Sequence, residues 1–274
     1  MKKNMKIPSE LEKILEKAWS DIPLDRRDCK YLLSLPEAGF EAGLLRAAAS
    51  AILRGRNDNS AIILGQIGVD ISPCPGGCKF CTIGDGHTRC TPSRLSGQEL
   101  EAKMGDFCRH GDLYGLYLMT MQDYDLERFL DIIRTAKRIA PETTQIWANV
   151  GDSPPEAFQE MKKAGVTGVY HVCRIGEGTD TGLKPEDRIR TMENALSSGL
   201  ELYTCCEPIG PEHTVDQLVD NIFIGIELGI TQHAAMRRVA VKGAPLARYG
   251  QISELRLAQI VAAVALCSAT VPTM

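Results

Sequence analysis

The chain has 274 residues, of which 44% are hydrophobic and 24% charged, ordinary values for a globular protein long enough to bury a stable core. Its 31 Lys and Arg against 35 Asp and Glu give a formal net charge of −4, which argues against a general nucleic-acid binder. No apolar run approaches the roughly 18 residues that a membrane span needs. The basic start, Met1–Lys6, leads into a polar segment and not into the apolar core of a signal peptide. We therefore expect a cytoplasmic protein without a membrane or nucleic-acid partner.

The first sixty residues are expected to be helical. Leu11, Ile14 and Leu15 recur at helical spacing. The stretch Pro36–Arg54 is rich in Ala and Leu around most of its circumference, which is typical of a helix buried against a larger body. We predict an N-terminal helical extension over residues 1–60.

From residue 61 the pattern alternates between strand and helix. The predicted strands are Ala61–Ile71, Tyr114–Met121, Gln145–Val150, Val166–Cys173, Leu200–Cys206 and Ala234–Val241. A helix is predicted after each one: from Ser96, over Leu126–Ile139, from Ser153, and over Pro185–Ser198, Val215–Leu228 and Ser253–Cys267. Six consecutive β-α units indicate a parallel sheet covered by helices. Because eight units do not fit this length, we predict an α/β fold, a partial (β/α)6 TIM-type barrel over residues 61–274.

A cluster of cysteines gives the strongest chemical signal. Ten cysteines are many for a cytosolic protein, where metal binding explains a cluster better than disulfides do. Cys74, Cys78 and Cys81 form a C-x3-C-x2-C run on a Gly-Pro loop just after the first predicted strand. Three thiolates suit a 4Fe–4S cluster with one iron left open, whereas structural zinc usually takes four ligands. A zinc site or a chance spacing remains the alternative.

The motif resembles that of the radical S-adenosylmethionine (SAM) superfamily, with an aromatic residue, Phe80, before the last cysteine. The resemblance implies that the open iron binds the amino and carboxylate groups of SAM. It also implies that an electron from the cluster cleaves SAM to methionine and a 5′-deoxyadenosyl radical, which abstracts hydrogen from a substrate. Phe80 would then contact the adenine.

Four further segments resemble the biotin synthase-like branch of that superfamily: Asp28–Pro36, Pro185–Arg188, Ser197–Gly210 and Val241–Leu246. This branch includes biotin synthase, the lipoyl synthase of the archaeal two-protein type, the hydrogenase maturase HydE and methylornithine synthase. The resemblance implies that Arg188 pairs with the SAM carboxylate, for which a planar guanidinium is well suited.

The thiols and cations outside the motif suggest a second site. Cys173, Cys205 and Cys206 end two neighbouring predicted strands and are candidates for an auxiliary iron–sulfur cluster or a sulfur-bearing intermediate. Only one of Cys205 and Cys206 is expected to face the barrel interior, since strand residues alternate. Inert buried cysteines are the alternative. Arg237 and Arg238 are candidates for binding a substrate carboxylate.

These thiols favour sulfur insertion into unactivated C–H bonds, a sulfurtransferase-type reaction of lipoyl or biotin-type cofactor synthesis. The alternatives are a radical SAM rearrangement or cofactor maturation, as in methylornithine synthase or HydE, and a non-catalytic iron–sulfur partner subunit. The resemblance implies a small-molecule or carrier-protein-bound acyl substrate and a reductant protein of the ferredoxin or flavodoxin type. A second radical SAM subunit is a further candidate partner.

Overall fold

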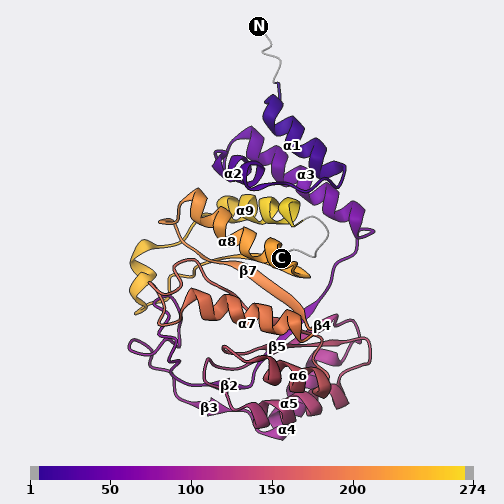
Figure 1. Ribbon diagram of the computed structural model, residues 1–274, viewed down its shortest axis with the longest axis vertical. Helices are drawn as coiled ribbons and strands as arrows, with labels where there is room; N and C mark the ends of the chain where they lie inside the picture. The colour runs from indigo at the N-terminus through magenta and orange to yellow at the C-terminus, as the bar shows by residue number, and fades with distance from the viewer. Residues whose placement is uncertain (1–5, 269–274) are drawn as a thin grey trace. The chain divides into compact units, whose positions relative to one another are not determined.

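The computed structural model describes residues 6–268, so the basic residues that open the sequence lie outside the described part. The chain forms two compact units. The first unit draws its described residues from the ranges 1–61, 205–238 and 251–274, and the second unit consists of residues 62–204 and 239–250. Figure 1 draws the helices and strands of both and labels most of them.

The main sheet has six strands in the hydrogen-bonded order β1-β4-β5-β6-β7-β8. Their bounds are Leu64–Gly68 (β1), Gly115–Met119 (β4), Gln145–Asn149 (β5), Gly168–Tyr170 (β6), Glu201–Ile209 (β7) and Gln232–Arg237 (β8). The strands from β1 to β7 pair in parallel, each with the next in this order. One helix follows each strand: α4 (Gly97–Cys108), α5 (Leu126–Ile139), α6 (Pro155–Ala164), α7 (Pro185–Ser197), α8 (Val215–Leu228) and α9 (Glu254–Cys267). The predicted α/β class and partial (β/α)6 TIM-type barrel are confirmed.

Both faces of the sheet are buried in the second unit, which explains its nearly continuous apolar strands. On one face, residues such as Leu116, Ile146 and Val169 join a hydrophobic core with side chains of α4, α5 and α6. The other face carries an aromatic cluster. Tyr117 stacks on Trp147, with ring centroids 5.6 Å apart, and Tyr203 meets both Tyr117 and Tyr170 edge-on.

The capping signals in the sequence fix the helix ends. Ser96 and Glu99 form the expected capping box at the start of α4, with Ser96 N donating to Glu99 Oε2 at 2.8 Å. Gly165, with φ +114°, ends α6 in a left-handed conformation that favours glycine. The first signal places the start of α4 at its predicted position, after Ser96.

In the first unit, the N-terminal helices α1 (Ser9–Trp19), α2 (Arg26–Ser34) and α3 (Phe40–Arg56) pack with α8 and α9. The fully buried side chain of Gln259 donates to the carbonyls of Leu32 and Leu35 at 2.8 and 2.9 Å. Arg256 donates to Leu33 O at 2.6 Å. These bonds satisfy the free carbonyls at the end of α2 and attach α9 to it. The division at residue 60 stays a prediction.

The structure differs from the sequence-based expectation around the cysteine motif. The segment predicted as one strand from Ala61 contains β1 and a separate strand β2 (Asp70–Ile71), which pairs antiparallel with β3 (Ser93–Arg94). Periodicity misses such pairs because two residues are too few to show an alternation. The 3-10 helix η1 (Pro245–Tyr249) was also not predicted. Among the described helices, none has the length and apolar character to cross a membrane.

Replacing Gly168 by Ala tests the packing of the aromatic face. A Cβ at Gly168 would lie 2.4 Å from Cζ3 of the fully buried Trp147, so Gly168→Ala overpacks the core. We expect the free energy of unfolding to fall by about 1–3 kcal/mol, measured by urea denaturation. The matched control, Gly105→Ala, adds a Cβ in open space on α4 and is expected to gain up to about 1 kcal/mol. Equal stability of the two variants would contradict this packing.

Candidate functional site

The three motif cysteines lie on a loop that connects β2 with β3 and folds back on itself. The carbonyl oxygen of Cys74 accepts from Gly77 N at 3.0 Å and from Asp85 N at 2.9 Å. Cys81 N donates to Cys78 O at 3.0 Å. Gly77 has φ +54°, a conformation that a residue without Cβ adopts without strain. The backbone therefore brings the first and last parts of the motif together.

Two of the motif sulfurs lie beside Gly76. A Cβ at Gly76 would lie 3.5 Å from Cys74 Sγ and 3.6 Å from Cys78 Sγ, so these two sulfurs lie close to the same point of the loop. Cys78 is buried, while Cys74 and Cys81 are partly exposed. Burial raises the pKa of Cys78 to about 11; the Arg174 charge opposes this, and nearby Cys81 and Cys74 add to it. The three thiols are therefore close enough to influence one another.

The donor set fits an iron–sulfur cluster better than a single ion. Among residues 6–268, no group of three Cys, His, Asp or Glu side chains converges tightly enough to hold a metal ion. Three cysteine thiolates on one short loop are a ligand set typical of a 4Fe–4S cubane, whose irons take thiolate ligands. The partial exposure of Cys74 and Cys81 leaves an approach for a further ligand.

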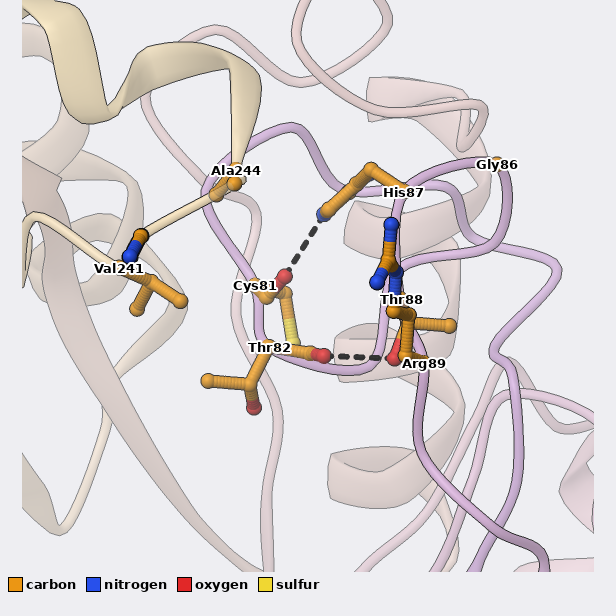
Figure 2. Close-up of a pocket in the computed structure, with 10 residues that line it drawn as sticks. Cys81, Thr82, Gly86, His87, Thr88, Arg89, Val241 and Ala244 are labelled. Atoms are coloured by element: carbon orange, nitrogen blue, oxygen red, sulfur yellow. Dashed lines mark hydrogen bonds between the residues drawn. The ribbon is translucent and has the colours of Figure 1, made fainter.

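Distant segments of the second unit hold the motif loop in place. Lys79 N donates to Asp180 O at 2.9 Å and Lys79 Nζ to Thr179 O at 2.7 Å. Leu246 N donates to Lys79 O at 3.1 Å. Within the loop, the His87 ring contacts Cys81 O at 2.8 Å (Figure 2). The motif is thus attached to the segments after β6 and β8.

Phe80 is half-buried between two motif cysteines, where the sequence resemblance expects it. The Arg174 guanidinium lies 6.0 Å from its ring centroid, within cation–π distance. Arg174 also lies 3.8 Å from Glu177. The contact of Phe80 with adenine stays a prediction, and Arg174 is an unforeseen neighbour of the motif.

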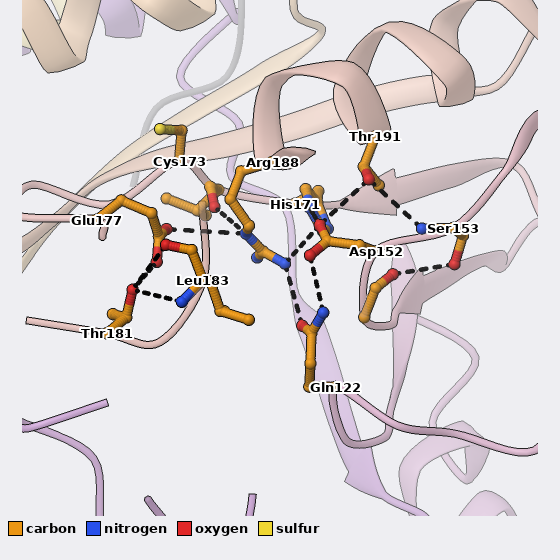
Figure 3. Close-up of polar contacts among 12 residues, drawn as sticks. Gln122, Asp152, Ser153, His171, Cys173, Glu177, Thr181, Leu183, Arg188 and Thr191 are labelled. Atoms are coloured by element: carbon orange, nitrogen blue, oxygen red, sulfur yellow. Dashed lines mark hydrogen bonds and ion pairs between the residues drawn. The ribbon is translucent and has the colours of Figure 1, made fainter. Parts of the chain in front are cut away.

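Arg188 lies in the first turn of α7 and is buried, with 4% of its surface exposed. Its Nε donates to Val172 O at 3.0 Å, and its Nη1 donates to Asp152 Oδ1 at 3.0 Å and Gln122 Oε1 at 3.2 Å (Figure 3). Glu177 lies 3.7 Å from Nε. Among the described residues, Nη2 has no hydrogen-bond partner. The guanidinium is therefore held through Nε and Nη1, and the pairing of Arg188 with a SAM carboxylate stays a prediction.

Asp152 is the shared acceptor of this network. Its carboxylate also accepts from Thr191 Oγ1 at 3.1 Å and from Gln122 Nε2 at 2.8 Å, and it lies 3.2 Å from His171 Nε2. Burial opposes its ionisation, but the hydrogen bond from His171 and the Arg188 charge hold the pKa of Asp152 well below its usual range. The carboxylate stays charged and compensates the buried guanidinium.

His171 is 1% exposed, and burial lowers its pKa from the ordinary 6.5 to about 4. The imidazole is neutral near pH 7, so Nε2 carries the proton given to Asp152 and Nδ1 is a bare acceptor. That Nδ1 atom is buried and has no partner among the described residues. His171 thus supports the carboxylate that orients Arg188.

The sequence analysis missed Asp152 and Gln122. A signal for both was available, because each follows a strand of the sheet at its carboxyl end, Asp152 after β5 and Gln122 after β4. In (β/α) folds that edge carries the functional side chains.

The other cysteine candidates, Cys173, Cys205 and Cys206, are all buried. Cys173 Sγ lies 4.0 Å from Pro185 O, and burial raises the pKa of Cys173 to about 11. Cys205 and Cys206 are consecutive in β7 and so project to opposite faces of the strand. Burial raises the pKa of Cys206 strongly, and Cys29 of α2 is a close neighbour. An auxiliary cluster at these cysteines stays a prediction.

The two candidate substrate arginines have partners within the first unit. Arg237 lies 3.6 Å from Glu254 and donates to Ile252 O at 3.3 Å. Arg238 is 2% exposed, and both of its terminal nitrogens donate to the carboxylate of Glu212. Nη2 lies 2.9 Å from Oε2. Their role in binding a substrate carboxylate stays a prediction.

Protein-family models and curated proteins give no match to the sequence. Solved structures do share the fold. Methylornithine synthase (PylB) has a TM-score of 0.83 at 15% identity, over 95% of this chain and 78% of that chain. HydG, a maturase of FeFe-hydrogenase, has a TM-score of 0.82 at 13% identity, over 98% of this chain and 63% of that chain.

A more distant likeness is to Streptococcus suis SuiB bound to S-adenosylmethionine, with a TM-score of 0.50 at 10% identity over 76% of this chain and 48% of that chain. The chain therefore spans less than two thirds of HydG and about half of SuiB. At these identities the likenesses establish the fold.

The buried His171 predicts a pH dependence of stability. The unfolded state takes up a proton near pH 6.5 and the folded state only near pH 4, so stability falls as pH drops through that window. We expect His171 to account for a loss of about 2 kcal/mol between about pH 7 and pH 5, measured by urea denaturation. In His171→Gln, this loss of unfolding free energy between about pH 7 and pH 5 is expected to disappear. The control His110→Gln changes an exposed histidine and is expected to keep the loss. An identical slope in His171→Gln and the unchanged protein would contradict the neutral, buried imidazole.

Proposed function

We propose that this protein is a radical SAM enzyme. The observation that carries the proposal is the loop of Cys74, Cys78 and Cys81, which follows the first strand of a partial barrel shared with methylornithine synthase. Cys74 and Cys81 both lie near enough to Cys78 to raise its pKa, so the three thiols of the loop are neighbours. The SAM-bound SuiB structure, a more distant likeness, supports the same class of ligand.

Three parts of the chain have separate roles in this proposal. Cys74, Cys78 and Cys81 hold a 4Fe–4S cluster by three irons. When bound, the cluster supplies the electron that cleaves SAM to methionine and a 5′-deoxyadenosyl radical. Arg188 directs its free Nη2 at the SAM carboxylate and so orients the methionine end. Phe80, kept in place by the loop, contacts the adenine.

The buried network around Arg188 explains why this residue is suited to a carboxylate. The carboxylates of Asp152 and Glu177 lie beside its charge, and Val172 O and Asp152 accept hydrogen bonds from Nε and Nη1. An immobilised guanidinium loses little conformational entropy when a carboxylate binds. His171 and Thr191 keep Asp152 fixed in turn.

For the reaction that follows SAM cleavage, a rearrangement or a cofactor maturation has as much support as sulfur insertion. The fold is shared with methylornithine synthase and with the maturase HydG. Sulfur insertion rests on Cys173, Cys205 and Cys206 as holders of a second cluster. Because Cys205 and Cys206 project to opposite faces of β7, one cluster takes only one of them.

Partners follow from the same chemistry. The cluster needs a low-potential electron donor, for which a ferredoxin or flavodoxin is the natural class. The substrate is a small molecule or an acyl group on a carrier protein. A second radical SAM subunit belongs to the sulfur-insertion alternative.

Removing any motif thiol tests the cluster site. Cys74→Ala, Cys78→Ala and Cys81→Ala are each expected to lose the iron and labile sulfide of anaerobically reconstituted protein, and to abolish 5′-deoxyadenosine formation with dithionite. Cys108→Ala, which removes a partly buried thiol outside the loop, is the matched control and keeps both. Unchanged iron in the motif variants would overturn the proposal, as would zinc in the purified protein.

The iron content also separates the two reactions. A rearrangement or maturation with a single cluster predicts about four irons per chain, and an auxiliary cluster predicts more. Formation of 5′-deoxyadenosine excludes the non-catalytic partner subunit in either case.

Replacing Arg188 tests the SAM site independently of the cluster. Arg188→Gln removes a charge-assisted hydrogen bond and is expected to weaken SAM binding by about 10- to 100-fold, measured by equilibrium dialysis. Arg188→Lys keeps the charge without the planar fork and should bind SAM with intermediate affinity. The control Arg190→Gln changes an exposed residue of the same helix and leaves binding unchanged. Unaltered SAM affinity in Arg188→Gln, with iron content intact, would rule out this role.

A further inference from the structure

A cavity of about 690 Å³ lies beside the third motif cysteine. One wall is the loop after Cys81, with Thr82 and residues 86–89, and the other wall is the segment 241–244 (Figure 2). Both walls belong to the second unit. The volume lies within the range of sites that bind small molecules, about 300–1,000 Å³.

Two cations line this cavity without partners of their own. Arg89 and Lys242 are exposed, and neither forms a hydrogen bond or an ion pair with any residue between 6 and 268. No described carboxylate lines the cavity. The neighbouring Asp85 is outside the lining, and its carboxylate accepts from Gly86 N at 2.9 Å. In a chain with a net charge of −4, this is a local excess of positive charge.

Hydrogen bonds fix the wall that carries Arg89. Thr88 Oγ1 donates to Thr82 O at 2.7 Å, and Thr88 N donates to Gly84 O at 3.1 Å. The His87 ring is held against Cys81 O. In the facing wall, Ala244 N donates to Val241 O at 3.0 Å, which fixes the turn of the segment 241–244. The cavity is thus built from fixed backbone, with flexible cationic side chains at its surface.

We propose that Arg89 and Lys242 bind an anionic group, a carboxylate or a phosphate, of the small-molecule substrate. This assignment rests on the proposed function, in which the one carboxylate of SAM is taken by the cluster and Arg188. The cations beside Cys81 therefore recognise a second molecule. Guanidinium and ammonium groups are the usual partners of both anions.

Site-specific protection of Lys242 tests this proposal. Reconstituted protein with saturating SAM is acetylated in chloride, inorganic phosphate or acetate at equal ionic strength, and the modification of each lysine is followed by mass spectrometry. By mass action, a concentration ten times the dissociation constant slows modification of Lys242 by about tenfold. Lys103, an exposed lysine on α4, is the internal control and reacts equally in all three salts. Stronger protection by phosphate or by acetate identifies the anion of the substrate.

Variants of Arg89 complete the test. Arg89→Gln is expected to lose the protection of Lys242, and Arg89→Lys, which keeps the charge, is expected to retain part of it. Two results would overturn the assignment: no protection by either anion, or equal protection in Arg89→Gln. Formation of 5′-deoxyadenosine in the same preparation shows whether the proposed function holds, so failure of the anion site is distinguished from failure of the enzyme class.

Discussion

The carbonyl oxygen of Cys74 accepts hydrogen bonds from both Gly77 and Asp85, and this pair of bonds shapes the whole site. It turns the motif loop back on itself and keeps the sulfurs of Cys74 and Cys78 on either side of Gly76. Without this turn, three thiols over eight residues would be spread along an extended chain. The loop is attached through Lys79 to the segments after β6 and β8, so the order of the thiols depends on the folded second unit.

The second constraint is the burial of charge around Arg188. A guanidinium removed from water is stable only where anions and carbonyls compensate it, and Asp152, Glu177 and Val172 O do so here. These groups come from segments that follow different strands of the parallel sheet. The carboxyl ends of parallel strands meet at one edge, which is how residues far apart in sequence form one network. The same arrangement leaves Nη2 for a ligand.

The sequence predicted the fold well because its signals are local. The capping box at Ser96 and Glu99 and the six alternating apolar segments each mark an element directly. The cysteine motif and Arg188 were also visible, through spacing and resemblance. The partners of Arg188 were not, because Asp152 and Gln122 carry no motif and acquire their role only when β4 and β5 lie side by side. The contact of Arg174 with Phe80 was missed for the same reason, because it joins segments far apart in sequence. The β2–β3 pair was missed because strands of two residues show no periodicity.

The central claim is that three thiolates hold a cubane whose fourth iron binds SAM. Electron paramagnetic resonance of the dithionite-reduced, reconstituted protein, recorded before and after addition of SAM, tests it most directly. The account predicts the signal of a reduced 4Fe–4S cluster, and a change of that signal when SAM occupies the open iron. A protein without such a signal, or a cluster signal that SAM leaves unchanged, would contradict it.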